Sequence, residues 1–185
     1  MNVLGISGSL RRDSYNRKLL VNAAELLPAG VEFELYEALK DVPPFDEDDE
    51  QPEPAAVARL RAAVAGADAL LIATPEYNSS IPGQLKNAID WASRPTTATS
   101  VLRNKPVAVV GASTGAFGAV WAQADLRKVL GAAGARVVEG EVAVGHAHER
   151  FDSEGRLEDE TLRGQLDELL EQLVVSARPR AAVAA

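Results

Sequence analysis

Short apolar runs alternate with helical stretches along the whole chain, and this alternation limits the possible folds more than any other feature. The apolar runs are predicted strands, and stretches with apolar residues three and four positions apart are predicted helices. Strands that alternate with helices form a parallel sheet with helices on both faces. The sequence therefore predicts an α/β fold in a single domain over residues 1–176, followed by a frayed, disordered tail over residues 177–185.

Five strands and five helices are expected to follow one another. The strands cover Val3–Ile6, Val31–Tyr36, Ala69–Ala73, Val107–Val110 and Arg136 to about Val144, and the helices begin near Leu19, Ala55, Gln84, Ala119 and Thr161. The second strand alternates apolar and polar residues, which is typical of the edge of a sheet. The third is apolar throughout, so we expect it to be covered on both faces.

The composition argues against several kinds of function. The chain of 185 residues has no cysteine and carries 27 acidic against 19 basic residues, for a net charge of −8. Without cysteine there is no disulfide, no thiolate metal site and no cysteine nucleophile. An acidic balance argues against nucleic acid as the main partner. No signal peptide or membrane-spanning stretch is visible, so a soluble cytoplasmic protein with no membrane partner is expected.

Three loops that follow predicted strands are rich in glycine, serine, threonine or asparagine. They are GSLRRDSYN at residues 8–16, TPEYNSSIPG at residues 74–83 and GASTGAFG at residues 111–118. Loops after parallel strands meet at one edge of the sheet, where ligands of such folds bind. We therefore expect one shared site. Taken singly, each loop also fits a plain connection: a capped helix start, a proline-containing turn or a flexible glycine loop.

The first of these loops carries the donors of a phosphate site. Ser9, Arg11, Ser14 and Asn16 supply hydroxyl, guanidinium and amide groups just before a predicted helix, whose N-terminus favours anions. The glycines do not follow the dinucleotide pattern G-x-G-x-x-G, and no G-K-[ST] closes a P-loop. Side-chain donors around the turn suit one terminal phosphate better than a pyrophosphate.

Together these motifs resemble the NAD(P)H-dependent FMN reductase family, a flavodoxin-like group that includes chromate, quinone and azo reductases. The resemblance runs from Met1 to about Val175, and its most specific part is PEYN followed by PGQLKNAIDW. It implies a three-layer flavodoxin-like fold with a five-stranded parallel sheet in the order 2-1-3-4-5. It also implies a homodimer or homotetramer with the flavin near the interface, where the segment from Pro43 to Asp46 reaches toward a neighbour's flavin.

The resemblance assigns FMN-binding residues by motif, with FMN held without a covalent link. Ser9, Arg11, Ser14 and Asn16 would hold the phosphate, Pro75, Glu76, Tyr77 and Asn78 would line the isoalloxazine ring, and Ser113 and Gly115 would approach its pyrimidine edge. Trp121 departs from the family pattern, in which this place often holds a basic residue.

The function implied is that of an FMN-dependent NAD(P)H oxidoreductase. Hydride from NADPH or NADH would reduce the flavin, and a quinone, azo compound, chromate or free flavin would then take two electrons. Because the cofactor supplies this chemistry, no catalytic side chain is expected. No metal is expected either, because the pair His146 and His148 has no further histidine or cysteine to complete a ligand set.

Three other classes of protein share features of this sequence. The principal alternative is a flavodoxin-like FMN electron carrier without an NAD(P)H site of its own. A phospho-receiver domain of the same topology needs an aspartate at the end of the third strand, where this chain has Ala73 and Thr74. A Rossmann dehydrogenase needs the missing glycine fingerprint.

Overall fold

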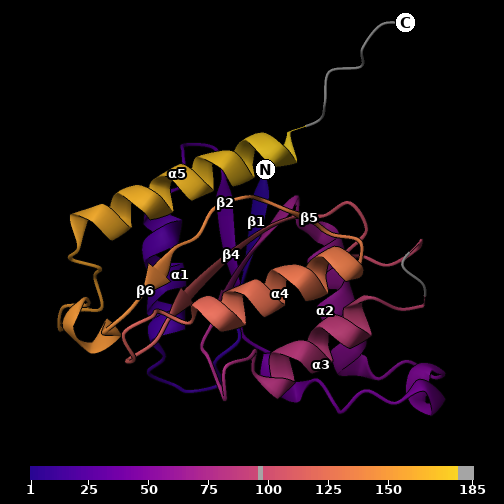
Figure 1. Ribbon diagram of the computed structural model, residues 1–185. Coiled ribbons are helices and arrows are strands. Elements are labelled where there is room, and N and C mark those ends of the chain that lie inside the picture. The colour runs from indigo at the N-terminus through magenta and orange to yellow at the C-terminus, as the bar shows by residue number, and fades with distance from the viewer. Residues whose placement is uncertain (96–97, 179–185) are drawn as a thin grey trace, which may run out of the picture.

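A single parallel sheet runs through the centre of the molecule (Figure 1). The computed structural model describes residues 1–95 and 98–178. The strands β1 (Asn2–Ser7), β2 (Glu32–Tyr36), β3 (Ala69–Thr74), β4 (Pro106–Ala112) and β5 (Arg136–Val137) lie in the order β2-β1-β3-β4-β5. A short strand β6 (Ala143–Val144) also pairs with β4. The strand order 2-1-3-4-5 is therefore confirmed.

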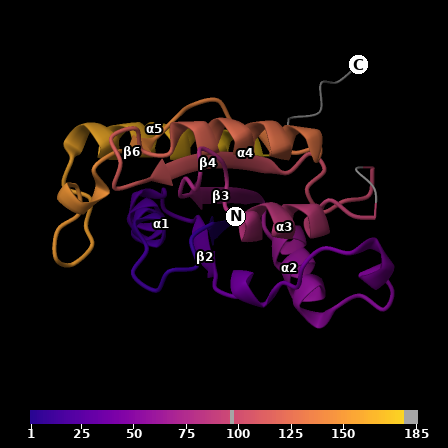
Figure 2. The ribbon, with the colours of Figure 1, turned by 60° about the horizontal axis from the view of Figure 1, so that its bottom comes forward.

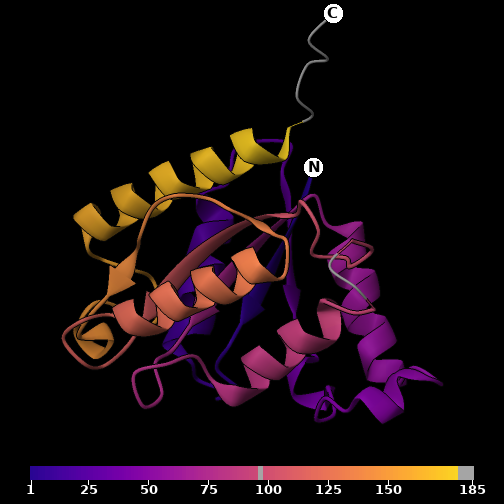
Figure 3. The same cartoon turned by 45° about the vertical axis from the view of Figure 1, so that its right-hand side comes forward.

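Helices cover both faces of this sheet, as the alternation of elements predicts. One face packs against α1 (Tyr15–Leu26) and α5 (Glu160–Ala177), and the other against α2 (Ala55–Gly66), α3 (Gly83–Ala92) and α4 (Val120–Ala132). Figure 2 shows α1 on one side of the strands with α2 and α3 on the other, and Figure 3 shows α3 and α4 in front of the sheet. The three-layer α/β fold is thus confirmed.

The core is divided between the two layers by the alternation of side chains along each strand. Leu70 and Ile72 of β3 pack with α2, α3 and α4, whereas Leu71 and Ala73 pack with α1 and α5. All residues of β3 and β4 are buried, while the edge strand β2 alternates between more and less exposed positions at its start. The expected roles of the covered third strand and the edge second strand are both confirmed.

The predicted fifth strand is interrupted in the structure. More residues separate Val137 from Ala143 than separate their partners Val107 and Gly111 on β4, so residues 139–141 bulge out between Val138 and Val142, which still form backbone hydrogen bonds with β4. Arg127 of α4 fills the gap: its guanidinium donates to the carbonyl of Gly140 at 2.5 Å and to that of Val109 at 3.4 Å. The side chain thereby satisfies backbone carbonyls that a continuous ladder would have paired.

Helix α5 is the last element of the described residues. Helix α5 ends at Ala177, one residue into the predicted tail, and residues 179–185 of that tail lie outside the described residues. Within the described ranges, no helix is both long enough and apolar enough to cross a bilayer.

Three loops leave the same edge of the sheet side by side, at the carboxyl ends of β1, β3 and β4. The parallel register pairs Ser7 with Ala73 and Thr74 with Gly111, so these strands end level with one another. Residues 8–14, 75–82 and 113–119 are called the first, second and third edge loops below. Their convergence is the structural result on which the candidate site depends.

Candidate functional site

A hollow of about 150 Å³, the edge hollow, lies between the three edge loops. It is lined by most of the residues that the sequence assigned to a site and by three further ones. These are Ser9, Arg11, Ser14, Tyr15, Asn16, Pro75, Glu76, Tyr77, Ala112, Ser113 and Thr114. Of the predicted set, Asn78 and Gly115 do not line the edge hollow, and Tyr15, Ala112 and Thr114 are the additions.

Ser14 is buried and caps the first helix. Its Oγ accepts hydrogen bonds from the backbone N–H groups of Asn16 at 3.2 Å and Arg17 at 3.4 Å. A helix N-terminus carries partial positive charge that favours an anion placed before it. The capped helix start and the anion site are therefore the same feature here, because α1 begins at the wall of the edge hollow.

The first edge loop leaves hydrogen-bond donors unused. Among the described residues, only one backbone N–H between residues 9 and 15 has an acceptor: that of Arg11, which lies 3.4 Å from Ser9 Oγ. The Arg11 guanidinium is exposed and forms no salt bridge within the described part of the chain. Free N–H groups, a guanidinium and a helix N-terminus make a donor set that fits a phosphate group.

Asp13 is the one carboxylate of this loop, and it is paired elsewhere. Lys18 lies 2.8 Å from its carboxylate. The hydrogen bond from Lys18 and the positive charge of that side chain lower the pKa of Asp13. The acidic group that would repel an anion is thus partly neutralised by a residue of α1.

Asn16 joins the first edge loop to the end of β4. Its Nδ2 donates to the carbonyl of Ala112 at 2.9 Å, and the N–H of Ala112 donates to its Oδ1 at 3.0 Å. Asn16 and Ala112 are both buried. The side-chain amide therefore acts as a strand neighbour for β4 and holds α1 in place, a structural role that the sequence pattern did not indicate.

The second edge loop is a tight turn. Tyr77 and Ser80 exchange backbone hydrogen bonds of 3.0 and 3.2 Å around Asn78 and Ser79, whose φ angles are 51° and 60°. Two successive positive φ angles are the mark of a type I′ turn, in which asparagine is favoured. Asn78 is therefore exposed at the tip of the turn, whereas the buried Pro75 and the half-exposed ring of Tyr77 line the edge hollow.

Glu76 connects the second edge loop to α4. That helix begins without a side-chain cap of its own, because Ala119 is its N-cap, with a φ of 64°. Glu76 Oε2 accepts the N–H groups of Trp121 at 3.1 Å and Ala122 at 3.2 Å. A carboxylate at this end of a helix is favourable. Glu76 thus fixes the start of α4 beside the edge hollow while also lining it.

The third edge loop is pinned to the segment that follows β6. The N–H of Ser113 donates to Val144 at 3.0 Å, and the N–H of His146 donates to the carbonyl of Gly115 at 2.9 Å. The N–H of Gly115 donates to Ser113 Oγ at 3.1 Å. Both backbone groups of Gly115 are therefore engaged within the protein, and this exposed residue does not line the edge hollow.

Two glycines allow this close approach. A Cβ atom on Gly145 would lie 2.1 Å from the carbonyl oxygen of Ala116, and one on Gly118 would lie 2.3 Å from the carbonyl carbon of Ala143. Gly118 also has a φ of 58°. The sequence indicated the glycines of the third edge loop. The need for glycine at position 145 follows only from its contact with the backbone of Ala116 in the folded protein.

Exposed aromatic rings accompany the second and third edge loops. Tyr77, Phe117 and Trp121 are 48%, 63% and 49% exposed, and the rings of Phe117 and Trp121 meet edge to face with centroids 5.1 Å apart. Grouped exposed apolar side chains commonly mark an interaction surface. Over residues 1–95 and 98–178, no group of three or more His, Cys, Asp or Glu side chains is placed to hold a metal ion.

Comparisons with known proteins agree with this geometry. A family model described as NADPH-dependent FMN reductase matches residues 1–149. An NAD(P)H-dependent FMN reductase of Pseudomonas aeruginosa is 43% identical over 180 residues, covering 96% of this chain and 96% of its own. A 2-hydroxy-1,4-benzoquinone reductase of a Burkholderia species is 36% identical over 181 residues, covering 97% of this chain and 98% of its own.

A solved structure is similar over nearly the same length. The flavoenzyme FerB of Paracoccus denitrificans, an NAD(P)H:(acceptor) oxidoreductase, superposes with a TM-score of 0.82 at 35% sequence identity, covering 95% of this chain and 98% of that one.

Proposed function

The chain belongs to the NADPH-dependent FMN reductase family, and from this premise we propose that it is an FMN-dependent NAD(P)H oxidoreductase that reduces small quinone-type acceptors. The observation that carries the proposal is the edge hollow itself. It combines a phosphate-binding donor set on the first edge loop with an apolar wall from the second, at the carboxyl edge of a flavodoxin-like sheet. Ligands of such folds bind at this edge.

Specific residues would hold each part of FMN. Ser9, Arg11 and the N-terminus of α1 would bind the phosphate, with Ser14 and Asn16 fixing that helix end. When bound, FMN supplies the redox chemistry, accepting a hydride equivalent from NAD(P)H and returning two electrons to the acceptor.

The opposite end of the edge hollow suits a flat ring. Pro75 and Tyr77 offer apolar contact, and Ser113 and Thr114 offer polar groups from the facing wall. Tyr77 is half exposed, so this end opens to solvent. The chain's own contribution is therefore to bind and orient, and no side chain is assigned a proton-transfer step.

An enzyme is favoured over an electron carrier. The relatives of this chain are named as reductases of FMN and of a benzoquinone, and they match it over nearly its whole length. A quinone is accordingly the acceptor we propose first, with azo compounds, chromate and free flavin as the other candidates. The proposed reductant is either NADPH or NADH.

We propose a homodimer or homotetramer with the edge hollow near the subunit contact. The exposed rings of Tyr77, Phe117 and Trp121 provide an apolar surface there. The segment from Pro43 to Asp46 is held to its own chain by Trp91, whose Nε1 donates to the carbonyl of Pro43 at 2.9 Å. Pro44 and Asp46 are exposed on this anchored segment and are available to a second subunit.

Steady-state kinetics of the FMN-loaded protein test the proposed reaction. We expect oxidation of NADPH or NADH that depends on an added acceptor, with a benzoquinone giving a higher kcat/KM than an azo dye, chromate or free FMN. Stable FMN binding without nicotinamide oxidation in the presence of any of these acceptors would instead identify an electron carrier.

A further inference from the structure

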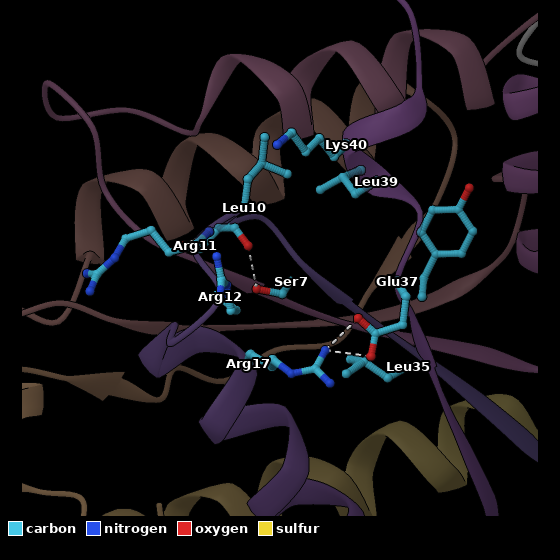
Figure 4. Close-up of a pocket in the computed structure, with 11 residues that line it drawn as sticks. Ser7, Leu10, Arg11, Arg12, Arg17, Leu35, Glu37, Leu39 and Lys40 are labelled. Atoms are coloured by element: carbon cyan, nitrogen blue, oxygen red, sulfur yellow. Dashed lines mark hydrogen bonds and ion pairs between the residues drawn. The ribbon is translucent and has the colours of Figure 1, made fainter.

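A second and larger pocket of about 340 Å³, the basic pocket, lies on the other side of the first edge loop. It is formed between that loop, the first turn of α1 and the chain that follows β2 (Figure 4). The edge hollow and the basic pocket both include Ser9 and Arg11 in their walls, so they adjoin along the first edge loop.

The basic pocket is positively charged in a protein whose net charge is −8. Arg12, Arg17 and Lys40 line it, and Glu37 is the one carboxylate in its wall. Arg17 and Glu37 neutralise each other, because Arg17 Nη1 lies 2.6 Å from both carboxylate oxygens. Within the described residues, Arg12 and Lys40 form no ion pair or side-chain hydrogen bond, so their charges remain available to an anion.

Figure 4 separates the roles of the neighbouring arginines. The Lys40 side chain extends toward Leu10, Arg17 reaches Glu37, and the guanidinium of Arg11 points away from these groups. Arg11 lines both pockets, but its guanidinium points away from Lys40 and Glu37, so Arg12 and Lys40 are the unpaired cations that we consider for the basic pocket. Arg12 and Lys40 line the same pocket, so a phosphate dianion bound there would be attracted by both charges.

An apolar wall accompanies the cations. Leu10, Leu35 and Leu39 line the basic pocket together with Tyr36. Apolar side chains beside a few fixed charges are typical of a site for an organic ligand rather than for a bare ion. The ligand that fits this combination has a planar base and a phosphate monoester.

A third hollow connects this region with the open end of the edge hollow. It is lined by Leu10, Arg11 and Tyr77, among others. Leu10 lines both this hollow and the basic pocket, so a dinucleotide whose nicotinamide lay beside Tyr77 would reach the basic pocket by passing Leu10.

We propose that the basic pocket binds the 2′-phosphate and adenosine end of NADPH, with Arg12 and Lys40 as the phosphate ligands. The proposal rests on the proposed reductase function, because it assumes that a nicotinamide dinucleotide is the reductant. It makes these two residues the determinants of preference for NADPH over NADH, a task that basic side chains near the adenosine ribose perform in other dinucleotide sites.

Calorimetric titration of the FMN-loaded protein tests the pocket without turnover. The probes are 2′,5′-ADP and 5′-AMP, which differ by the 2′-phosphate alone, and inorganic phosphate. We expect 2′,5′-ADP to bind at least about tenfold more tightly than 5′-AMP, and the double variant Arg12→Glu/Lys40→Glu to abolish that difference. The matched control Lys128→Glu changes an exposed lysine of α4 and should preserve it.

Kinetics then connect the pocket to the reaction. In the double variant, the ratio of kcat/KM for NADPH to that for NADH should fall by about tenfold or more. Circular dichroism shows whether charge reversal impairs folding. If it does, the milder variant Arg12→Ala/Lys40→Ala replaces the double glutamate variant, and we expect it to shift the ratio in the same direction.

The outcomes separate the two proposals. Equal affinity for 2′,5′-ADP and 5′-AMP, or binding of inorganic phosphate as tight as that of 2′,5′-ADP, would overturn the basic pocket as an NADPH site and leave the reductase function intact. Failure of both nicotinamides to reduce the flavin would overturn the reductase function, while the titrations would still report whether the pocket selects a 2′-phosphate.

Discussion

Arg11 and Arg12 are adjacent in the sequence, yet only Arg11 lines the edge hollow. Both arginines line the basic pocket. The pattern GSLRRDSYN indicates an anion site but does not tell these two guanidiniums apart, because their directions depend on the path of the loop in space.

Replacing Arg11 by alanine should weaken FMN binding by about 1.5–3 kcal/mol, the contribution of a hydrogen bond to a charged group. Fluorescence titration of the apo-protein with FMN measures this. Arg12→Ala removes the same charge from the next residue and is the matched control, with an expected FMN dissociation constant close to that of the wild type. Equal losses in the two variants would mean that only the overall charge of the loop matters.

Two buried asparagines of α1 provide a second comparison. Asn16 holds the backbone of Ala112 beside the edge hollow, whereas Asn22 bonds Gly155 at 2.8 Å and Leu157 at 2.8 Å, away from it. Either substitution by alanine leaves buried backbone groups unpaired and should lower the free energy of unfolding by about 2–4 kcal/mol.

Only Asn16→Ala should also raise the FMN dissociation constant. Urea unfolding of the apo-proteins and FMN titration of both variants check this pair of expectations. A similar loss of FMN affinity in Asn22→Ala would show that general destabilisation, and not the loss of the hydrogen bonds between Asn16 and Ala112, accounts for the effect.

At the residue scale, the predicted residues that directly follow a strand or begin a helix all line the edge hollow. They are Pro75 after β3, Ser113 after β4, and Ser14 and Asn16 at the start of α1. Asn78 and Gly115 were assigned by motif but lie outside it, because a type I′ turn and a backbone pairing place them elsewhere. Such turn geometry is not contained in the order of residue types.

At the element scale, the periodicity of the sequence predicted the strands that are apolar runs. It did not predict the interruption of the fifth strand, where side chains form hydrogen bonds with the backbone. Residues 139–141 bulge out of the sheet, and the Arg127 guanidinium donates to the carbonyl of Gly140 there. The one sequence signal for this interruption is the pair of charged residues, Glu139 and Glu141, that flank Gly140. The role of Glu76 as the cap of α4 likewise depends on two segments meeting in space.

The glycines of α4 and of the loop before it should respond in opposite ways to alanine. Gly118 has a φ of 58° and no room for a Cβ against the backbone of Ala143 and Val144, whereas Gly131 lies in the helix with nothing within 4 Å of an added Cβ. Gly118→Ala should therefore destabilise the fold by about 2 kcal/mol or more and weaken FMN binding. Gly131→Ala should stabilise it by about 0.5–1 kcal/mol.

Thermal and urea unfolding of the two variants measure these changes. If Gly118→Ala has the same free energy of unfolding as the wild type, the third edge loop adapts to the added Cβ. The exact position of this loop would then not be required for the site.

At the scale of the whole molecule, the site belongs to the sheet edge rather than to any one motif. Asn16 bonds the first edge loop to β4, Glu76 bonds the second to α4, and Ser113 bonds the third to β6. These hydrogen bonds hold three separate segments together at one edge of the sheet, where the parallel strand order predicts that they meet. The basic pocket extends the same edge toward β2, where no motif had indicated a site.

The most direct measurement of the central claim is anaerobic mixing of the FMN-loaded protein with NADPH while the visible absorbance of the flavin is followed. We predict that the absorbance bleaches without any partner protein and returns when a benzoquinone is added. A flavin that stays oxidised in the presence of both NADPH and NADH, and is reduced only after a separate reductase is supplied, would contradict the account.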